Sequence, residues 1–271
     1  MITAVLRGDE QTLLGGISAI AEGDAAIVVS TGGARKRYAS VDPNEDAAAF
    51  AIGEGGILLM VADGHHGREA AEWAVERTLE RSAPLWTAPN AGDLDRDWAE
   101  VAAEAFLDAN AVILDRAARG GRAKARTTLA LALVRPREDL LAWAAVADSL
   151  VFRVAESEAR ALAPTGPARV FLGAPAETEA SLRPHFAVGR ESLAGARAVV
   201  LATDGLSERG VGVESPETTL LAAADRVRRA DPAARPLELA RGLVEDALAA
   251  HRRHRAGDNV ATACVWLTRD P

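Results

Sequence analysis

The order of the predicted secondary-structure elements constrains the fold more than any other feature of this sequence. Apolar, β-branched runs predict a first group of strands that ends with Ile57–Ala62. Two segments with apolar residues at helical spacing follow, Arg68–Leu85 and Asp95–Arg119. A second group of strands, a second helical pair and one closing strand complete the chain. This order lacks the strict alternation of a doubly wound sheet, so it favours an α+β fold in which each helical pair covers one antiparallel sheet.

The remaining elements are predicted from the same patterns. Pro216–Arg229 and Pro236–Arg253 form the second helical pair. Glu156–Arg190 is rich in proline, glycine and glutamate and is poorly periodic, which indicates a long excursion with short elements. The other expected strands are Ile2–Leu6, Ala25–Ser30, Thr127–Val134, Leu140–Val146, Leu150–Val154, Ala198–Ala202 and Asn259–Leu267.

Length and composition restrict the class of protein. A chain of 271 residues with 49% hydrophobic and 26% charged residues, and no break in composition, favours a single domain over residues 1–271. The net charge of −8 argues against a nucleic-acid partner, because a duplex binder needs basic surface. The basic cluster from His251 to Arg255 follows an amphipathic segment and is interpreted as a solvated helix end.

No membrane partner is expected either. No apolar stretch approaches the ~20 residues that span a bilayer. The N-terminal residues lack the basic segment and apolar core of a secretion signal, so we expect a cytoplasmic protein. The single cysteine, Cys264, excludes a disulfide within the chain and a zinc site built from several thiolates.

Acidic residues stand at the ends of several predicted core strands. Asp63 and Asp204 each follow an apolar strand and precede a glycine, and Asp148 also follows a strand. Asp258 opens the last strand, and Asp46 precedes another apolar stretch. A tight turn or a helix cap explains any one of these positions. Together they favour strand ends that meet at one rim and bring several carboxylates close together.

Such a cluster of like charges needs a cation to stay ionised. Carboxylate and carbonyl oxygens favour hard ions such as Mg²⁺ or Mn²⁺ over zinc or copper. Two such ions ~4 Å apart can activate a shared water and hold a phosphoryl oxygen for in-line attack. The glycines after Asp63 and Asp204 allow the backbone to approach the ions closely.

Six short motifs occur in a fixed order that covers most of the chain. They are Asn44-Glu45-Asp46, Val61-Ala62-Asp63-Gly64-His65-His66-Gly67, Thr127-Thr128, Val146-Ala147-Asp148-Ser149, Ala202-Thr203-Asp204-Gly205-Leu206 and Asp258-Asn259. This set resembles the motifs of the metal-dependent serine/threonine protein phosphatases of the PPM type, which are also called protein phosphatase 2C-like. The resemblance extends over about residues 25–267. It implies a four-layer α-β-β-α sandwich of two mostly antiparallel sheets flanked by helical pairs, with a variable flap-like segment at about residues 156–190.

The resemblance also implies a role for each motif residue. The carboxylates that hold two Mn²⁺ or Mg²⁺ ions are Asp46, Asp63, Asp204 and Asp258, with Asp63 bridging the ions and Gly64 offering its backbone carbonyl. Asp148, together with Asp204, matches the ligands of a third and weaker ion. His65 corresponds to the general acid for the leaving oxygen, Glu45 to a residue that orients metal-bound water, and Asn259 to a support for Asp258. The implied reaction is hydrolysis of phosphoserine and phosphothreonine esters by a water that bridges the metals.

Several positions depart from the family pattern. Val41 stands where the family places a phosphate-binding arginine, so we expect a basic residue of the preceding loop to clamp the phosphate, with Arg37 favoured over Arg35 and Lys36. Ala147 replaces the glycine before the third-metal aspartate, and Arg126 replaces the glycine before the two threonines.

Two alternatives to the active protein phosphatase stay open. The missing arginine motivates a catalytically weak PPM-like module that binds a partner or a phosphorylated segment. A hydrolase of small phosphate esters on the same scaffold is the other alternative. The favoured hypothesis is a monomeric enzyme that acts on phosphorylated proteins and counters a serine/threonine kinase.

Overall fold

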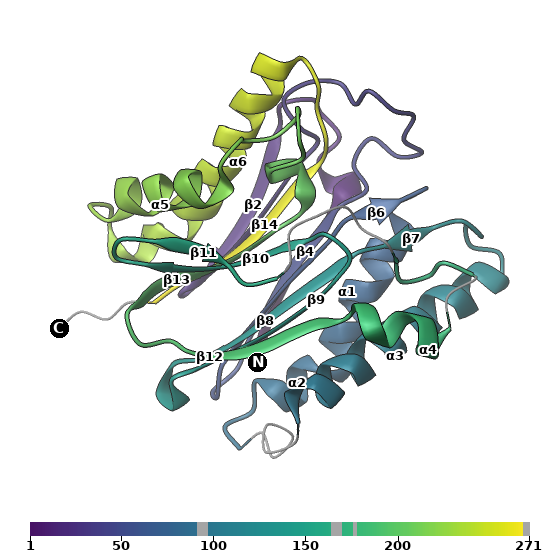
Figure 1. Ribbon diagram of the computed structural model, residues 1–271, viewed down its shortest axis with the longest axis horizontal. Helices are drawn as coiled ribbons and strands as arrows, with labels where there is room; N and C mark the ends of the chain where they lie inside the picture. The colour runs from purple at the N-terminus through teal and green to yellow at the C-terminus, as the bar shows by residue number, and fades with distance from the viewer. Residues whose placement is uncertain (91–96, 164–169, 176–177, 268–271) are drawn as a thin grey trace.

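Two antiparallel sheets lie face to face in the computed structural model (Figure 1), which describes residues 1–90, 97–163, 170–175 and 178–267. Within these residues each sheet has six strands. The first sheet has the order β1 (Ile2–Arg7), β4 (Ala47–Ile52), β5 (Ile57–Ala62), β8 (Leu129–Arg135), β9 (Leu140–Val146), β12 (Ala187–Ser192). The second has the order β11 (Ala159–Ala161), β10 (Leu150–Ala155), β13 (Ala196–Ala202), β14 (Val260–Trp266), β3 (Ala25–Ser30), β2 (Ile17–Glu22). The expected α+β class with two antiparallel sheets is confirmed.

Helices cover the outer face of each sheet (Figure 1). The first sheet is covered by α1 (Glu69–Arg81), α2 (Ala83–Trp86) and α3 (Trp98–Ala118), and the second by α5 (Pro216–Val227) and α6 (Arg235–His254). A short helix, α4 (Glu179–Leu182), lies near α3. Single 3-10 turns occupy Gly8–Glu10, Pro136–Glu138, Arg183–His185, Asp204–Leu206 and Pro232–Ala234. No helix in the described part of the chain is both long enough and apolar enough to cross a membrane.

Three apolar cores separate the four layers. The strands are apolar at consecutive positions because both faces of each sheet are covered. In β5, Leu58 and Met60 face the helices, whereas Leu59 and Val61 face the other sheet. A third core joins the outer face of the second sheet to α5 and α6. Burial of each such side chain stabilises the fold by about 1.5–3 kcal/mol, which explains why these strands were predictable.

The edge strands are where the prediction was incomplete. β2 was not predicted, because most of its residues are exposed and it lacks an apolar alternation. The segment predicted as an irregular excursion, Glu156–Arg190, contains β11 and runs into β12, which are edge strands of the two sheets. Part of the segment 156–190 thus belongs to the two sheets, and residues 164–169 and 176–177 within it lie outside the described residues.

A small two-stranded sheet lies beyond the first large sheet. It consists of β6 (Gly64–His65) and β7 (Arg126–Thr127), with Gly64 opposite Thr127 and His65 opposite Arg126. Thr127 exchanges two backbone hydrogen bonds of 2.9 Å with Leu172. The predicted strand Thr127–Val134 is thus divided into β7 and β8, and β7 belongs to this small sheet.

Candidate metal centre

Strand register places Asp46 and Asp63 side by side. Asp46 directly precedes β4 and Asp63 directly follows β5. These strands are antiparallel neighbours in which Ala47 pairs with Ala62, so the two aspartates leave the sheet at the same edge. The hydroxyl of Thr128 accepts a 2.9 Å hydrogen bond from the Asp63 backbone N–H, which fixes the chain at this point.

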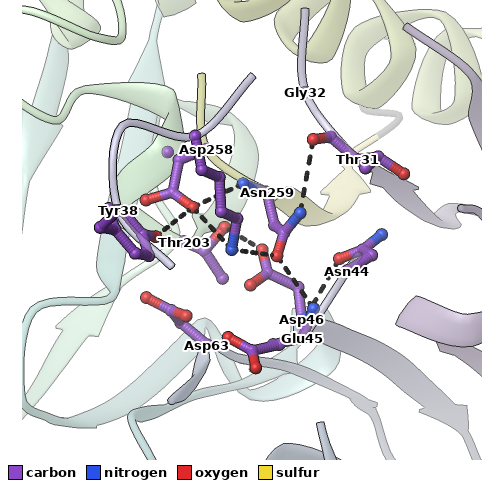
Figure 2. Close-up of polar contacts among 12 residues, drawn as sticks. Thr31, Gly32, Tyr38, Asn44, Glu45, Asp46, Asp63, Thr203, Asp258 and Asn259 are labelled. Atoms are coloured by element: carbon purple, nitrogen blue, oxygen red, sulfur yellow. Dashed lines mark hydrogen bonds and ion pairs between the residues drawn. The ribbon is translucent and has the colours of Figure 1, made fainter. Parts of the chain in front are cut away.

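The second sheet supplies Asp204 and Asp258 in the same way. Asp204 follows β13 and Asp258 precedes β14, and these strands are paired with Ala202 opposite Thr262. Thr203 connects the two sheets, because its hydroxyl donates a 2.7 Å hydrogen bond to Asp46 Oδ2. Figure 2 shows the carboxylates of Asp46, Asp63 and Asp258 gathered in one small region.

The carboxylates repel one another in a buried setting. Burial raises the pKa of Asp63 well above its usual value, and the charges of Asp204, Asp46 and Asp258 raise it further. The pKa of Asp204 is raised well above its usual value for the same reasons, with Asp258 and Asp148 as its strongest like-charged neighbours. Burial also raises the pKa of Asp46 to about 7. A site of this kind is stabilised by cations.

Part of the compensating charge comes from Lys36. Its ammonium nitrogen lies 3.1 Å from Asp258 Oδ1 and donates a 2.6 Å hydrogen bond to Asn259 Oδ1. The hydroxyl of Tyr38 donates to the same Asp258 oxygen at 2.7 Å, as Figure 2 shows. Both residues belong to the β3–β4 loop, residues 31–46. Lys36 therefore neutralises charge inside the cluster.

The structure does not bring Arg37 to the carboxylates, contrary to the expectation that it clamps a phosphate there. Its guanidinium is exposed and donates a 2.9 Å hydrogen bond to the backbone carbonyl of His254 at the end of α6. Arg37 lies between Lys36 and Tyr38, whose side chains reach Asp258, and its own side chain takes a different direction from the loop. The direction of the Arg37 side chain could not be read from the sequence, because the path of this loop has no periodic sequence pattern.

The donor set fits hard divalent ions, since it consists of carboxylate oxygens with raised pKa values. The side chains are not yet arranged as ligands: among the described residues, no three His, Cys, Asp or Glu side chains are placed to hold one metal ion. Lys36, Tyr38 and Thr203 take up oxygens of Asp258 and Asp46. Binding of an ion by these oxygens would require these contacts to rearrange.

Glu45 and Asn259 hold the loop around the centre. Glu45 Oε1 accepts backbone hydrogen bonds from Gly67 at 2.7 Å and from Val41 and Asp42 at 3.2 Å each. Asn259 Oδ1 accepts from the Glu45 backbone N–H at 2.9 Å. In this arrangement Glu45 organises the backbone near Asp63 through one oxygen.

His65 and Gly64 lie next to the cluster on β6. His65 Nε2 is 3.8 Å from Asp63 Oδ2. Burial, followed by the positive charge of Arg126, lowers the pKa of His65 to about 4, so the imidazole is neutral at neutral pH. Gly64 has no room for a side chain, since a Cβ atom there would lie 2.4 Å from the Glu45 carbonyl oxygen.

Asp148 lies in the turn between β9 and β10, and its charge acts on Asp204. The preceding residue, Ala147, has φ 71°, a left-handed conformation that favours glycine. The sequence-predicted aspartates are thus brought to one edge of the two sheets.

Several residues that the structure places at the site had no role there that could be predicted from the sequence. Thr203 and Thr128 are part of the quoted motifs. Thr203 directly precedes Asp204 and Thr128 directly precedes β8, and these positions could have indicated a place at the site. Lys36 was named only as a lesser candidate for the phosphate clamp, and Tyr38 carried no signal, because both lie in an irregular polar loop. Phe171, which contacts His65, lies in a segment predicted to be irregular.

Comparisons with known proteins identify the family. The family model described as protein phosphatase 2C matches residues 31–249. No curated protein matches the chain. A bacterial serine phosphatase has a similar structure, with a TM-score of 0.68 and 16% identity over 92% of this chain and 100% of that one. The serine-threonine phosphatase 2C of Toxoplasma gondii has a TM-score of 0.68 and 15% identity over 93% of this chain and 99% of that one.

A third similar structure is the serine/threonine phosphatase PstP/Ppp of Mycobacterium tuberculosis, with a TM-score of 0.60 and 20% identity over 94% of this chain and 99% of that one. At these identities the solved structures establish the fold, and the family model, which covers more than half of the chain, establishes the family. The chain belongs to the protein phosphatase 2C family.

Proposed function

We propose that this protein hydrolyses phosphoserine and phosphothreonine esters with the help of two Mn²⁺ or Mg²⁺ ions held by Asp46, Asp63, Asp204 and Asp258. The observation that carries the proposal is the convergence of four aspartates from paired strand ends of both sheets, with raised pKa values for three of them. A fold that buries like charges in this way loses stability unless the cluster binds a cation. The bound ions would activate water and neutralise charge on the phosphate.

The remaining residues of the site have complementary roles in this proposal. Gly64 offers its carbonyl beside Asp63, and Asp148 supports a third, weaker ion together with Asp204. Glu45 keeps the backbone of the β3–β4 loop in place and directs its second carboxylate oxygen to water. His65 donates a proton to the leaving oxygen, because a bound dianionic phosphate stabilises the protonated imidazole and raises its pKa from about 4.

The substrate class follows from the family, whose members act on phosphoproteins. We further propose that the enzyme is a cytoplasmic monomer that opposes a serine/threonine kinase. Analytical ultracentrifugation at micromolar protein concentration tests the monomeric state, since a dimer would have twice the chain mass of 28.3 kDa.

One observation favours a second candidate, a weakly catalytic module that binds phosphorylated partners. Arg37 is directed away from the cluster and Lys36 is held by Asp258 and Asn259, so neither of these two side chains of the β3–β4 loop is free to bind a phosphate at the cluster. Such a module would bind metal and phosphopeptide without useful turnover.

Phosphate release from a phosphothreonine peptide separates the two candidates. The assay compares the protein with Mn²⁺, the protein with EDTA, and Asp204→Asn with Mn²⁺. We expect turnover only in the first arm, because the other two lack the ions or one of their ligands. A folded, Mn²⁺-binding protein without turnover would contradict the hydrolase and support the binding module. A parallel assay with a small aryl phosphate shows whether turnover requires a peptide.

A further inference from the structure

Three chain segments form a platform next to His65. β6 carries His65, β7 carries Arg126 opposite it, and Leu172 is hydrogen-bonded to Thr127 of β7. Phe171, which precedes Leu172, is thereby placed near both His65 and Arg126. The platform adjoins the metal centre, because His65 is in contact with Asp63.

Phe171 contacts both of these side chains with its ring. The ring centroids of Phe171 and His65 are 4.7 Å apart with an interplanar angle of 85°. The guanidinium carbon of Arg126 lies 4.6 Å from the centre of the Phe171 ring. A cation over an aromatic face is attracted to it and loses freedom of movement. Phe171 therefore holds Arg126 at a defined place beside His65.

Arg126 and His65 can each form a further hydrogen bond. Arg126 Nε and His65 Nε2 are buried, and neither has a hydrogen-bond partner in the described ranges. No carboxylate forms an ion pair with Arg126 within the part of the chain that the structure covers. Buried polar nitrogens without hydrogen-bond partners are costly, so a ligand that supplies an acceptor to Arg126 Nε would stabilise this arrangement.

Three other basic residues near the centre are already engaged. Lys36 is bound to Asp258 and Asn259, and Arg37 to the carbonyl of His254. Arg122 pairs with Glu69 and lies 3.5 Å from Asp42. Compared with these three, Arg126 has both the position beside His65 and an open donor that suit an anion at this site.

We propose that Arg126, held by Phe171, binds a phosphoryl oxygen of the substrate next to His65. The assignment rests on the proposed phosphatase function and names a residue where the family has glycine. A guanidinium offers two parallel N–H donors to a phosphoryl group, which a single ammonium does not. Its positive charge also offsets the repulsion between the phosphate and the acidic centre.

Equilibrium binding of inorganic phosphate to the Mn²⁺-loaded protein tests this role. Arg126→Gln removes the charge, Arg126→Lys keeps the charge without the fork, and Arg241→Gln is the matched control on the exposed face of α6, where Arg241 pairs with Glu245. We expect the phosphate Kd to rise about tenfold in Arg126→Gln and less in Arg126→Lys, as for a lost charge-assisted hydrogen bond. The control should keep the wild-type Kd, and all variants should bind Mn²⁺ with wild-type affinity.

Steady-state kinetics with a phosphopeptide provide a second, independent measurement. For Arg126→Gln we expect KM to rise by a similar factor while kcat changes less, and Phe171→Leu should shift KM in the same direction. An unchanged phosphate Kd in Arg126→Gln, or no phosphate binding by the wild-type protein, would overturn the assignment. Phosphate binding that depends on Arg126 without any turnover would count against the hydrolase alone and leave the phosphate site standing.

Discussion

Single residues of the candidate metal centre lower the stability of the fold that carries them. Asp63 is buried among Asp204, Asp46 and Asp258, and this raises its pKa well above the usual range. We expect Asp63→Asn to stabilise the metal-free protein by about 1 kcal/mol or more, because the amide keeps the shape and removes a repelled charge. Chemical denaturation in EDTA measures this change. The same variant should lose the stabilisation that Mn²⁺ gives to the wild type, and a less stable variant in EDTA would contradict this account.

We expect Lys36 and a divalent ion to compete for the carboxylate of Asp258. Its ammonium lies 3.1 Å from Asp258 Oδ1, so it both repels an incoming ion and occupies a ligand oxygen. We expect Lys36→Met to lower the Kd for Mn²⁺ about tenfold in a calorimetric titration. Lys124→Met is the matched control, since Lys124 is exposed. Equal or weaker Mn²⁺ binding by Lys36→Met would show that Lys36 does not compete.

The turn before Asp148 contains local backbone strain. Ala147 has φ 71°, where a side chain costs about 1–2 kcal/mol relative to the right-handed region. Ala147→Gly relieves this strain but makes the unfolded chain more flexible, so we expect a net gain of about 0.5–1 kcal/mol in the free energy of unfolding. Urea denaturation of Ala147→Gly and of Ala145→Gly, a control in β9 that should be destabilised, measures the difference. Destabilisation of both variants would argue against strain at Ala147.

At the scale of elements, α6 is connected to the site through a buried histidine. His251 Nδ1 accepts a 3.1 Å hydrogen bond from the Gly33 N–H, and its Nε2 lies 2.8 Å from the Gly205 carbonyl oxygen. Burial lowers the pKa of His251, in keeping with a neutral ring that accepts on one side and donates on the other. The helix thereby positions both the β3–β4 loop and the turn after Asp204.

Replacement of His251 should therefore lower the stability of the fold. We expect His251→Phe to lower the free energy of unfolding by about 2–4 kcal/mol, because two buried backbone groups lose their partners. His254→Phe, in the partly exposed last turn of α6, is the control and should cost much less. Thermal and urea unfolding measure both variants, and similar losses in the two would contradict a bridging role for His251.

How well each strand or helix could be predicted from the sequence depends on how much of it is buried. Core strands such as β5 and β13 were predicted nearly to their boundaries, because burial on both faces requires continuous apolar runs. β2 and β12 lie at sheet edges and have few buried residues, so their sequences carry little periodic pattern. His251 was assigned to a solvated helix end, since its basic neighbours conceal that its position on α6 faces the core.

At the scale of the whole molecule, the site is a consequence of topology. The aspartates could be located from the sequence because each lies at the end of a recognisable core strand, and antiparallel pairing then brings Asp46 beside Asp63 and Asp204 beside Asp258. The charged partners could not be located in this way. Lys36, Arg37 and Arg126 depend on loop paths and on a two-residue strand, for which no hydrophobic pattern exists.

The most direct test of the central claim is a calorimetric titration of the protein with Mn²⁺, which gives the number of ions bound and their affinity. We expect two tightly bound ions per chain in the wild type, weaker binding of a third ion at high concentration through Asp148, and loss of tight binding in Asp63→Asn. A folded wild-type protein that binds no Mn²⁺ or Mg²⁺, or an Asp63→Asn variant with unchanged stoichiometry and affinity, would contradict the assignment of these aspartates as the metal centre.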